Sequence, residues 1–170
     1  LKFVPASGAA SRMFKNLFEY LENGKKTDFI ETFLSEKDNF AFGPELANLD
    51  GKAAVRYLLE DMNYGNLPKG LLLFHSYTEG ARTPALEHLV EGAMYASSKG
   101  EVNIHFTVSH EHLPLFQAHI AENLSAYEAK LGVKFHVSYS EQKPSTDTLA
   151  ANPDGTPFRT ADGKLLFRPG

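Results

Sequence analysis

Runs with a β pattern alternate with long helical runs in this chain, and this order constrains its fold more than any other feature. Residues 102–109 and 133–139 alternate apolar with polar side chains, and residues 113–131 between them have an amphipathic helical pattern that ends at Gly132. Two strands joined by such a helix pair in parallel through a crossover. The order therefore predicts an α/β fold with a mainly parallel sheet and helices on both faces.

Earlier segments extend the same order. Residues 2–5 have the composition of a short first strand, and residues 12–21 have the apolar spacing of a helix. The longest apolar run opens residues 71–75, which we expect to form a strand buried on both faces. A further helix is expected to begin at Thr83-Pro84 and to end near Ser98, since proline suits the first helical position.

Two stretches interrupt this order. Residues 23–66 show helical patterns over 28–36, where Thr27 can cap the helix, and from about 51 to 62, but no strand pattern. We expect a helical insertion there. Residues 152–167 hold two tight-turn signals and predict a β-hairpin excursion. The 170 residues suffice for one domain with a core and are too few for two ordinary ones.

Composition excludes several classes of protein. Hydrophobic residues make up 42% of the chain and charged residues 22%, which is typical of folded soluble domains. The net charge of −4 gives no broad positive field for nucleic acid. No apolar run approaches the roughly 20 residues of a membrane span, and cysteine is absent, which excludes disulfides and thiolate chemistry. We expect a cytoplasmic protein and, because the chain starts without Met inside an apolar run, a partial domain of something longer.

Polar clusters follow the predicted strands, where ligands of open α/β sheets bind. In residues 7–12, a turn of small residues lets backbone N–H groups approach an anion, and Arg12 adds a permanent cation. An equally weighted interpretation is that the small residues only relieve crowding between strand and helix. Lys69, between Pro68 and Gly70, precedes a predicted strand and would reach the same region only through its loop; it is either a phosphate-binding cation or a solvated loop lysine. Gln142, in the polar loop 140–148, carries an amide that can bind a base edge.

Histidines give a third, weaker hypothesis. His110 and His112 flank Glu111 after a strand, and such a pair can bind zinc, with His75 or His88 as a further ligand. That arrangement would serve a metal-dependent hydrolase. The favoured interpretation is a polar strand end that leads into the next helix.

Taken in order, four motifs resemble those of one family. The segment Ala6-Ser7-Gly8-Ala9-Ala10-Ser11-Arg12 resembles the A-G-G-x-G-T-R signature of the sugar nucleotidyltransferases, the nucleotide-diphosphate-sugar pyrophosphorylases. Residues 68–72 and 83–89 resemble their P-K-x-L-L segment and the helix that follows it. Residues 140–144, with the Gly-containing turns up to Gly170, resemble the UDP-sugar branch.

The resemblance implies a GT-A fold and a nucleotide-binding domain. It places along the nucleotide the residues Ala6, Ser7, Gly8, Ala9, Ala10, Ser11, Gln142 and Gly170. Arg12 and Lys69 would be catalytic, because they would stabilise charge on the phosphates. A sugar 1-phosphate would attack the α-phosphate of an NTP, with UTP favoured, and release pyrophosphate. Mg²⁺ is implied as cofactor, with ligands beyond residue 170, so we expect no metal ligand in this chain.

The signature departs from the family at two of its three glycines, where this chain has Ser7 and Ala10. A Cβ at either position narrows the space that a phosphate needs. The alternative function is therefore a catalytically degenerate relative that binds a nucleotide or another ligand without turnover. The sequence does not indicate an oligomeric state.

Overall fold

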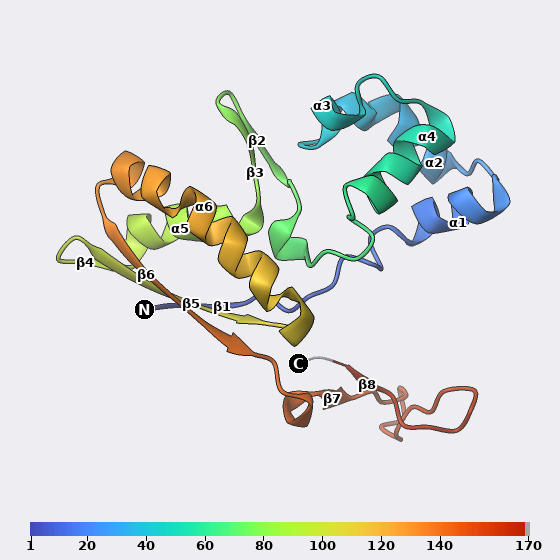
Figure 1. The fold of residues 1–170 in the computed structure, drawn as a ribbon. Helices are drawn as coiled ribbons and strands as arrows, with labels where there is room; N and C mark the ends of the chain where they lie inside the picture. The colour runs from blue at the N-terminus through green and yellow to red at the C-terminus, as the bar shows by residue number, and fades with distance from the viewer. Residues whose placement is uncertain (169–170) are drawn as a thin grey trace.

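The central sheet is built on one long strand. The computed structural model describes residues 1–168. Strand β5 (Glu101–Val108) pairs in parallel with β1 (Lys2–Pro5) along one edge and with β6 (Lys134–Glu141) along the other. The short β4 (Ser97–Ser98) pairs antiparallel with the start of β5. The fold is thus α/β, with mixed sheets, and Figure 1 shows β5 and its neighbour β6 beneath the helices.

Helices cover one face of this sheet. Helix α5 (Pro84–Tyr95) and helix α6 (Leu113–Leu131) pack on the face that carries the buried side chains of β5, which are Val102, Ile104, Phe106 and Val108. Figure 1 shows both helices above the strands. The expectation of helices on both faces is therefore wrong for residues 1–168. The strict alternation in β5 explains this, because it leaves every second side chain polar.

The other face of the sheet carries a polar network. The ring of His105 stacks on Phe3, with centroids 5.5 Å apart. Its two nitrogens lie 2.8 Å from the hydroxyls of Ser138 and Ser140, and Ser140 also lies 3.0 Å from the Thr107 hydroxyl. Hydrogen bonds between neighbouring strands thus take the place of a second apolar layer.

Residues 15–61 form a separate helical block, seen at the upper right of Figure 1. Its elements are α1 (Lys15–Asn23), α2 (Asp28–Glu36), a 3₁₀ turn (Lys37–Asn39), α3 (Gly43–Leu46), and α4 (Gly51–Arg56) with a π-helical turn (Tyr57–Asp61). The bounds of α2 are those that its periodicity predicts, and the Thr27 hydroxyl accepts the Ile30 N–H at 3.4 Å. The block has its own apolar cluster, which extends from Ala10 to Leu72.

The predicted strand over residues 71–75 is wrong. A 3₁₀ turn (Lys69–Leu71) is followed by irregular chain, and only β2 (His75–Tyr77) is extended, in an exposed hairpin with β3 (Gly80–Arg82). Leu71 packs against the apolar cluster of the sheet, whereas Leu72 is buried in that of the helical block. The apolar run therefore connects two cores instead of lying inside one sheet.

The first helix also begins later than predicted. Residues 11–14 form a turn, and α1 starts at Lys15 without a side-chain cap. The small-residue turn after β1 is thus separated from the N-terminus of α1 by this extra turn. The helix ends at Asn23, and its C-cap, Gly24, has a φ of 69°, which lies in the left-handed region.

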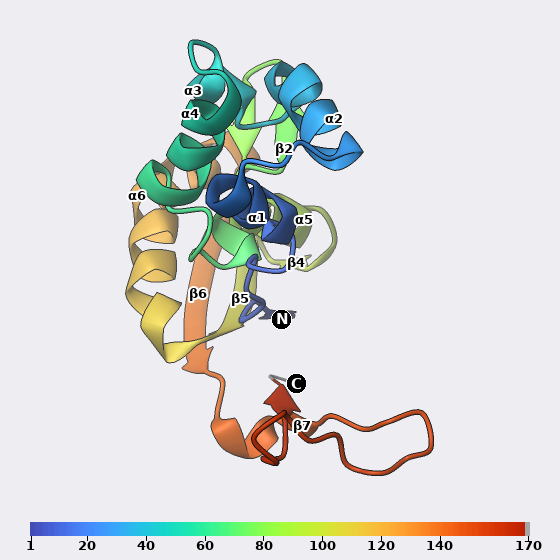
Figure 2. The ribbon, with the colours of Figure 1, turned by 90° about the vertical axis from the view of Figure 1, so that its right-hand side faces the viewer.

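After β6 the chain leaves the sheet, as Figure 2 shows at the bottom. A 3₁₀ turn (Pro144–Thr146) precedes the two-stranded pair of β7 (Thr148–Leu149) with β8 (Phe167–Arg168). Between them the chain turns at Gly155 and Gly163, both with positive φ. This is the excursion that the two turn signals predict. No helix within residues 1–168 is long and apolar enough to cross a membrane.

Candidate functional site

Two chain segments meet at the carboxyl end of β1. Residues 6–9 leave the sheet towards the helical block, and residues 68–69 return from that block. The backbone N–H of Lys69 donates to the Gly8 carbonyl at 3.0 Å, and Ala9 forms an antiparallel bridge with Pro68. The Ala6 N–H donates to the Thr107 carbonyl at 2.7 Å, which holds the first segment against β5. The structure thus brings the first two motifs side by side.

The third motif reaches the same place from the end of β6. The backbone N–H of Gln142 donates to the Val108 carbonyl at 2.8 Å. Its side-chain oxygen accepts the hydroxyl of Ser7 at 2.5 Å, a contact between residues 135 positions apart. We call Ser7, Gly8, Lys69 and Gln142 the junction site, because they join the ends of β1 and β6 to the segment that returns from the helical block.

A cavity of about 190 Å³ opens beside the junction site. Gly8 and Lys69 lie at its rim, and its lining also includes His88 from the first half of α5. The apolar wall is formed by side chains from the sheet and helices, including Val4, Ala85, Phe106 and Phe116. No carboxylate lines this cavity among the residues that the structure describes. The cavity therefore combines an apolar wall with a cationic rim.

Several donors at the junction site have no acceptor in the described chain. Within residues 1–168, no carbonyl or side chain accepts the N–H groups of Gly8 or Ala9, and the Lys69 ammonium forms no hydrogen bond or ion pair. The Ser7 hydroxyl occupies the oxygen of Gln142, so the amide hydrogens of Gln142 remain free to donate. A Cβ added to Gly8 would meet no heavy atom of residues 1–168 within 4 Å. Donors and space together suit a bound anion.

The predicted small-residue turn divides into two parts. Ala6, Ser7, Gly8 and Ala9 lie at the junction, but the side chain of Ala10 is fully buried in the apolar cluster of the helical block. Its methyl group therefore packs in a core and does not face a ligand. Gly170 lies outside the residues that the structure describes.

Arg12 lies apart from the junction cavity. Its exposed side chain borders a shallow hollow beside α1, together with Ser11, Lys15, Phe18, Glu19 and Glu22. None of these residues lines the cavity beside Lys69. The structure therefore does not bring the two predicted catalytic cations to one cavity.

The histidines have structural contacts instead of a shared centre. His112 lies 2.8 Å from the Ser109 hydroxyl through Nδ1 and 3.0 Å from the Asn66 carbonyl through Nε2, so both ring nitrogens are occupied. The exposed His110 lies 3.0 Å from a carboxylate oxygen of Glu141. Within residues 1–168, no three His, Cys, Asp or Glu side chains are grouped for a metal. His112 ties the loop that returns from the helical block to the sheet.

Sequence reasoning missed two contributors to the junction cavity. His88 lines it one turn inside α5, whereas the sequence indicated this residue only as a possible metal ligand and as part of the 83–89 motif. Gly70 also lines it, and a Cβ there would lie 2.7 Å from Cζ of Phe116. That close approach depends on α6, which is distant in the sequence.

Comparison with known proteins gives a family but no described activity. No curated protein and no solved structure matches the chain. Over residues 1–170 it matches the family described as Domain of unknown function (DUF4301). The match covers the whole sequence, so the chain belongs to the DUF4301 family.

Proposed function

We propose that the junction site binds the phosphates of a nucleotide, and that the protein is a nucleotidyltransferase of the kind that couples an NTP to a sugar 1-phosphate. The observation that supports this proposal most directly is a pair of contacts, from Ser7 to Gln142 and from Lys69 to Gly8. Together they join three separate motifs at one end of the sheet. The GT-A fold and the preference for UTP belong to this proposal. They rest on the resemblance in residues 6–12, 68–72 and 140–144.

The donors at the junction define how phosphate would bind. The Lys69 ammonium supplies a point charge at the rim, and the N–H groups of Gly8 and Ala9 supply directed hydrogen bonds. The Gln142 amide, fixed by Ser7, supplies further donors for the nucleotide. Such contacts hold the α-phosphate in place without covalent participation of the protein.

The proposed reaction is a substitution at phosphorus. An oxygen of the sugar 1-phosphate forms a bond to the α-phosphorus of the NTP. The bond from that phosphorus to the oxygen bridging to the β-phosphate breaks, and pyrophosphate leaves with the bonding electrons. Lys69 stabilises the negative charge that develops on the phosphate oxygens. The structure places Arg12 beside α1, away from the junction cavity. A catalytic role for Arg12 is therefore supported by the family resemblance alone.

Magnesium does not fit the donors of the junction cavity. Mg²⁺ prefers carboxylate oxygens, and none lines this cavity among residues 1–168. The resemblance places the metal ligands beyond residue 170. No step above therefore depends on a metal ion held by this chain.

One observation favours the alternative, a degenerate relative that binds without turnover. The two residues that replace signature glycines both have structural contacts, since Ala10 packs in the apolar cluster and Ser7 donates to Gln142. A turn stabilised in this way needs no bound substrate to keep its shape. The two functions differ only in turnover.

Calorimetric titration of the protein with UTP, the other NTPs and UDP-sugars, with magnesium present, tests the binding. We expect Lys69→Ala to weaken binding about tenfold or more, because it removes a charge-assisted contact. Gly8→Ala should weaken binding without loss of stability, since its Cβ meets only open space. Lys26→Ala, in the exposed loop before α2, is the matched control and should leave affinity unchanged. The absence of binding by every nucleotide, or unchanged affinity in Lys69→Ala, would refute the proposal.

Release of pyrophosphate separates the two functions. The protein is incubated with UTP, magnesium and a panel of sugar 1-phosphates, and pyrophosphate is measured. Turnover that falls in Arg12→Ala with little change in stability supports the transferase and a role for this exposed guanidinium. Retained nucleotide affinity with no pyrophosphate from any sugar phosphate supports the degenerate relative.

A further inference from the structure

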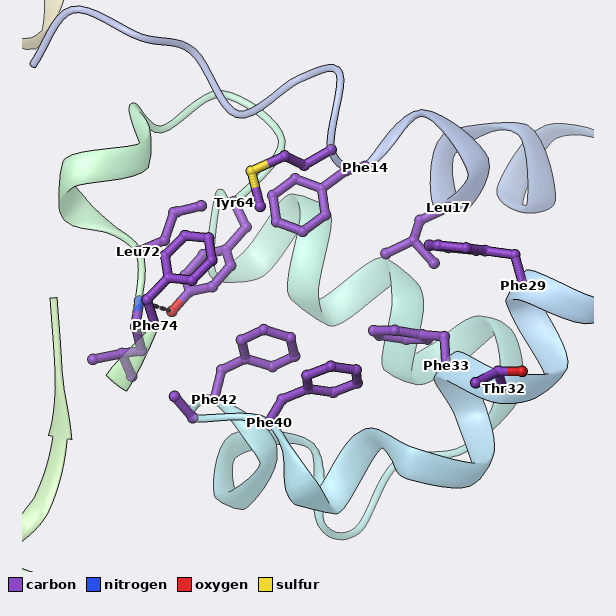
Figure 3. Close-up of a pocket in the computed structure, with 13 residues that line it drawn as sticks. Phe14, Leu17, Phe29, Thr32, Phe33, Phe40, Phe42, Tyr64, Leu72 and Phe74 are labelled. Atoms are coloured by element: carbon purple, nitrogen blue, oxygen red, sulfur yellow. Dashed lines mark hydrogen bonds between the residues drawn. The ribbon is translucent and has the colours of Figure 1, made fainter. Parts of the chain in front are cut away.

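The helical block contains a second cavity, of about 280 Å³, which lies apart from the junction site (Figure 3). Four parts of the chain form its walls. They are the turn before α1 with the first residues of that helix, helix α2 with residues 40–42, Tyr64, and residues 72–74. Its lining residues are Met13, Phe14, Leu17, Phe29, Thr32, Phe33, Phe40, Ala41, Phe42, Tyr64, Leu72, Leu73 and Phe74. Walls on several sides make it a cavity and not a flat apolar patch.

The lining is almost entirely hydrocarbon. Among residues 1–168, no charged side chain belongs to it. The Tyr64 hydroxyl accepts the Leu73 N–H at 3.1 Å, which Figure 3 shows as a dashed line, so this group already has a partner. Burial raises the pKa of Tyr64, which therefore stays neutral at physiological pH. The remaining polar side chain, Thr32, is exposed. The chemistry of the walls thus offers contact with apolar surface and no partner for a charge.

Aromatic rings give these walls their shape. Phe40 stacks on Phe33 and on Phe42, with centroids 5.5 and 5.2 Å apart, and Phe42 meets the edge of Tyr64 at 5.6 Å. This continuous series of rings follows one side of the cavity (Figure 3). Rings packed against each other hold a fixed surface, so a ligand would meet preformed walls.

Partly exposed rings lie around the buried interior. Phe29, Phe40 and Phe74 are 46%, 37% and 45% exposed, whereas Phe14 and Phe33 are buried. A ligand that fills the cavity would cover apolar surface of the exposed rings and gain contacts with the buried ones. Removal of apolar surface from water is the largest favourable contribution available at such a site.

We propose that this cavity binds a neutral, apolar small molecule. An apolar cavity of about 150 Å³ accepts one benzene molecule, so the present cavity suits a molecule of about two rings. The occupant is a small molecule because the space is enclosed on several sides and is limited in volume. It is neutral because the lining offers no opposite charge. This site uses none of the junction-site residues, so it does not depend on the proposed function.

Fluorescence titration with N-phenyl-1-naphthylamine tests the proposal: this neutral dye has three aromatic rings, of which the fused naphthyl pair matches the size of the cavity and the phenyl ring can extend past the partly exposed rings at its margin. We expect saturable binding that naphthalene displaces. Thr32→Trp places a large side chain at the exposed margin of the cavity, and Phe74→Ser removes a half-exposed ring; each should weaken binding about tenfold. Phe158→Ser is the matched control, because Phe158 is similarly exposed, at 40%, and lies in the C-terminal excursion. It should leave the affinity unchanged.

Three results would overturn the proposal. The first is the absence of saturable dye binding. The second is a loss of dye affinity in the Phe158→Ser control equal to that in Phe74→Ser. The third is a dimer, seen by sedimentation, that dissociates in Phe74→Ser, because a second copy of the chain would then be the occupant. Circular dichroism checks that each variant is folded. If Phe74→Ser unfolds, Thr32→Trp decides, since Thr32 is exposed on α2.

Discussion

The glycine after Lys69 gives a direct test of how the junction is built. A Cβ at Gly70 would lie 2.7 Å from Cζ and 3.1 Å from Cε1 of Phe116. Phe116 is fully buried and lines the junction cavity, so either its ring must turn towards that cavity or the backbone of Gly70 must shift to admit the added methyl group. Overpacking of this kind costs about 1–3 kcal/mol. Reduced freedom of the unfolded chain in Gly70→Ala returns ~0.4–1 kcal/mol. We expect a net loss of about 1–2 kcal/mol.

Thermal unfolding of matched alanine variants measures this cost. For a chain of this length, the expected loss lowers the melting temperature by about 2–8 °C. Gly8→Ala is the control, since its Cβ meets nothing within 4 Å and its φ is not positive. Gly65→Ala is intermediate, because its nearest neighbour is Phe18, whose partly exposed ring has room to turn. A Gly70→Ala protein as stable as Gly8→Ala would refute the argument that Phe116 closes this side of the junction.

Two further predictions concern the helices. Burial lowers the pKa of His119, whose Nε2 lies 2.8 Å from the Thr83 hydroxyl. The unfolded chain therefore binds the proton more readily, so the free energy of unfolding should fall as the pH drops below about 6.5. In denaturant unfolding of His119→Gln, the free energy of unfolding should fall less over that pH range. Thr27→Ala removes the hydroxyl that accepts the Ile30 N–H, and should lower the free energy of unfolding by about 1 kcal/mol, measured by urea titration.

Local patterns predicted the longer helices and strands. Residues 28–36 and 113–131 became helices with the expected bounds, since their apolar spacing and terminal signals agree with each other. The strand over residues 101–108 was equally clear from its alternation. That alternation also contradicts a second helical layer, because a strand covered on both faces would not carry polar residues at every second position. The sequence contained this information, and the prediction of helices on both faces did not use it.

Contacts between distant segments could not be predicted in the same way. The apolar run of residues 71–74 has the composition of a buried strand if all of its side chains are assumed to pack in the same core. Its side chains instead divide between two apolar clusters. The cavity of aromatic rings was missed for a similar reason, since Phe29 and Phe33 were assigned to one helix face without a view of what Phe74 contributes. Only the tertiary arrangement shows that these rings surround a common space.

The position of Lys69 between two cores has a consequence for function. Leu71 packs against the sheet and Leu72 against the helical block, so both cores fix the backbone that carries this lysine. The bond from its N–H to Gly8 then sets its distance from the turn after β1. Positioning of charge within a fraction of an ångström is what phosphoryl chemistry requires of a protein. The helical block therefore does more than extend the fold, because it supplies part of the packing that fixes the backbone from which the exposed side chain of Lys69, the proposed phosphate-binding cation, extends.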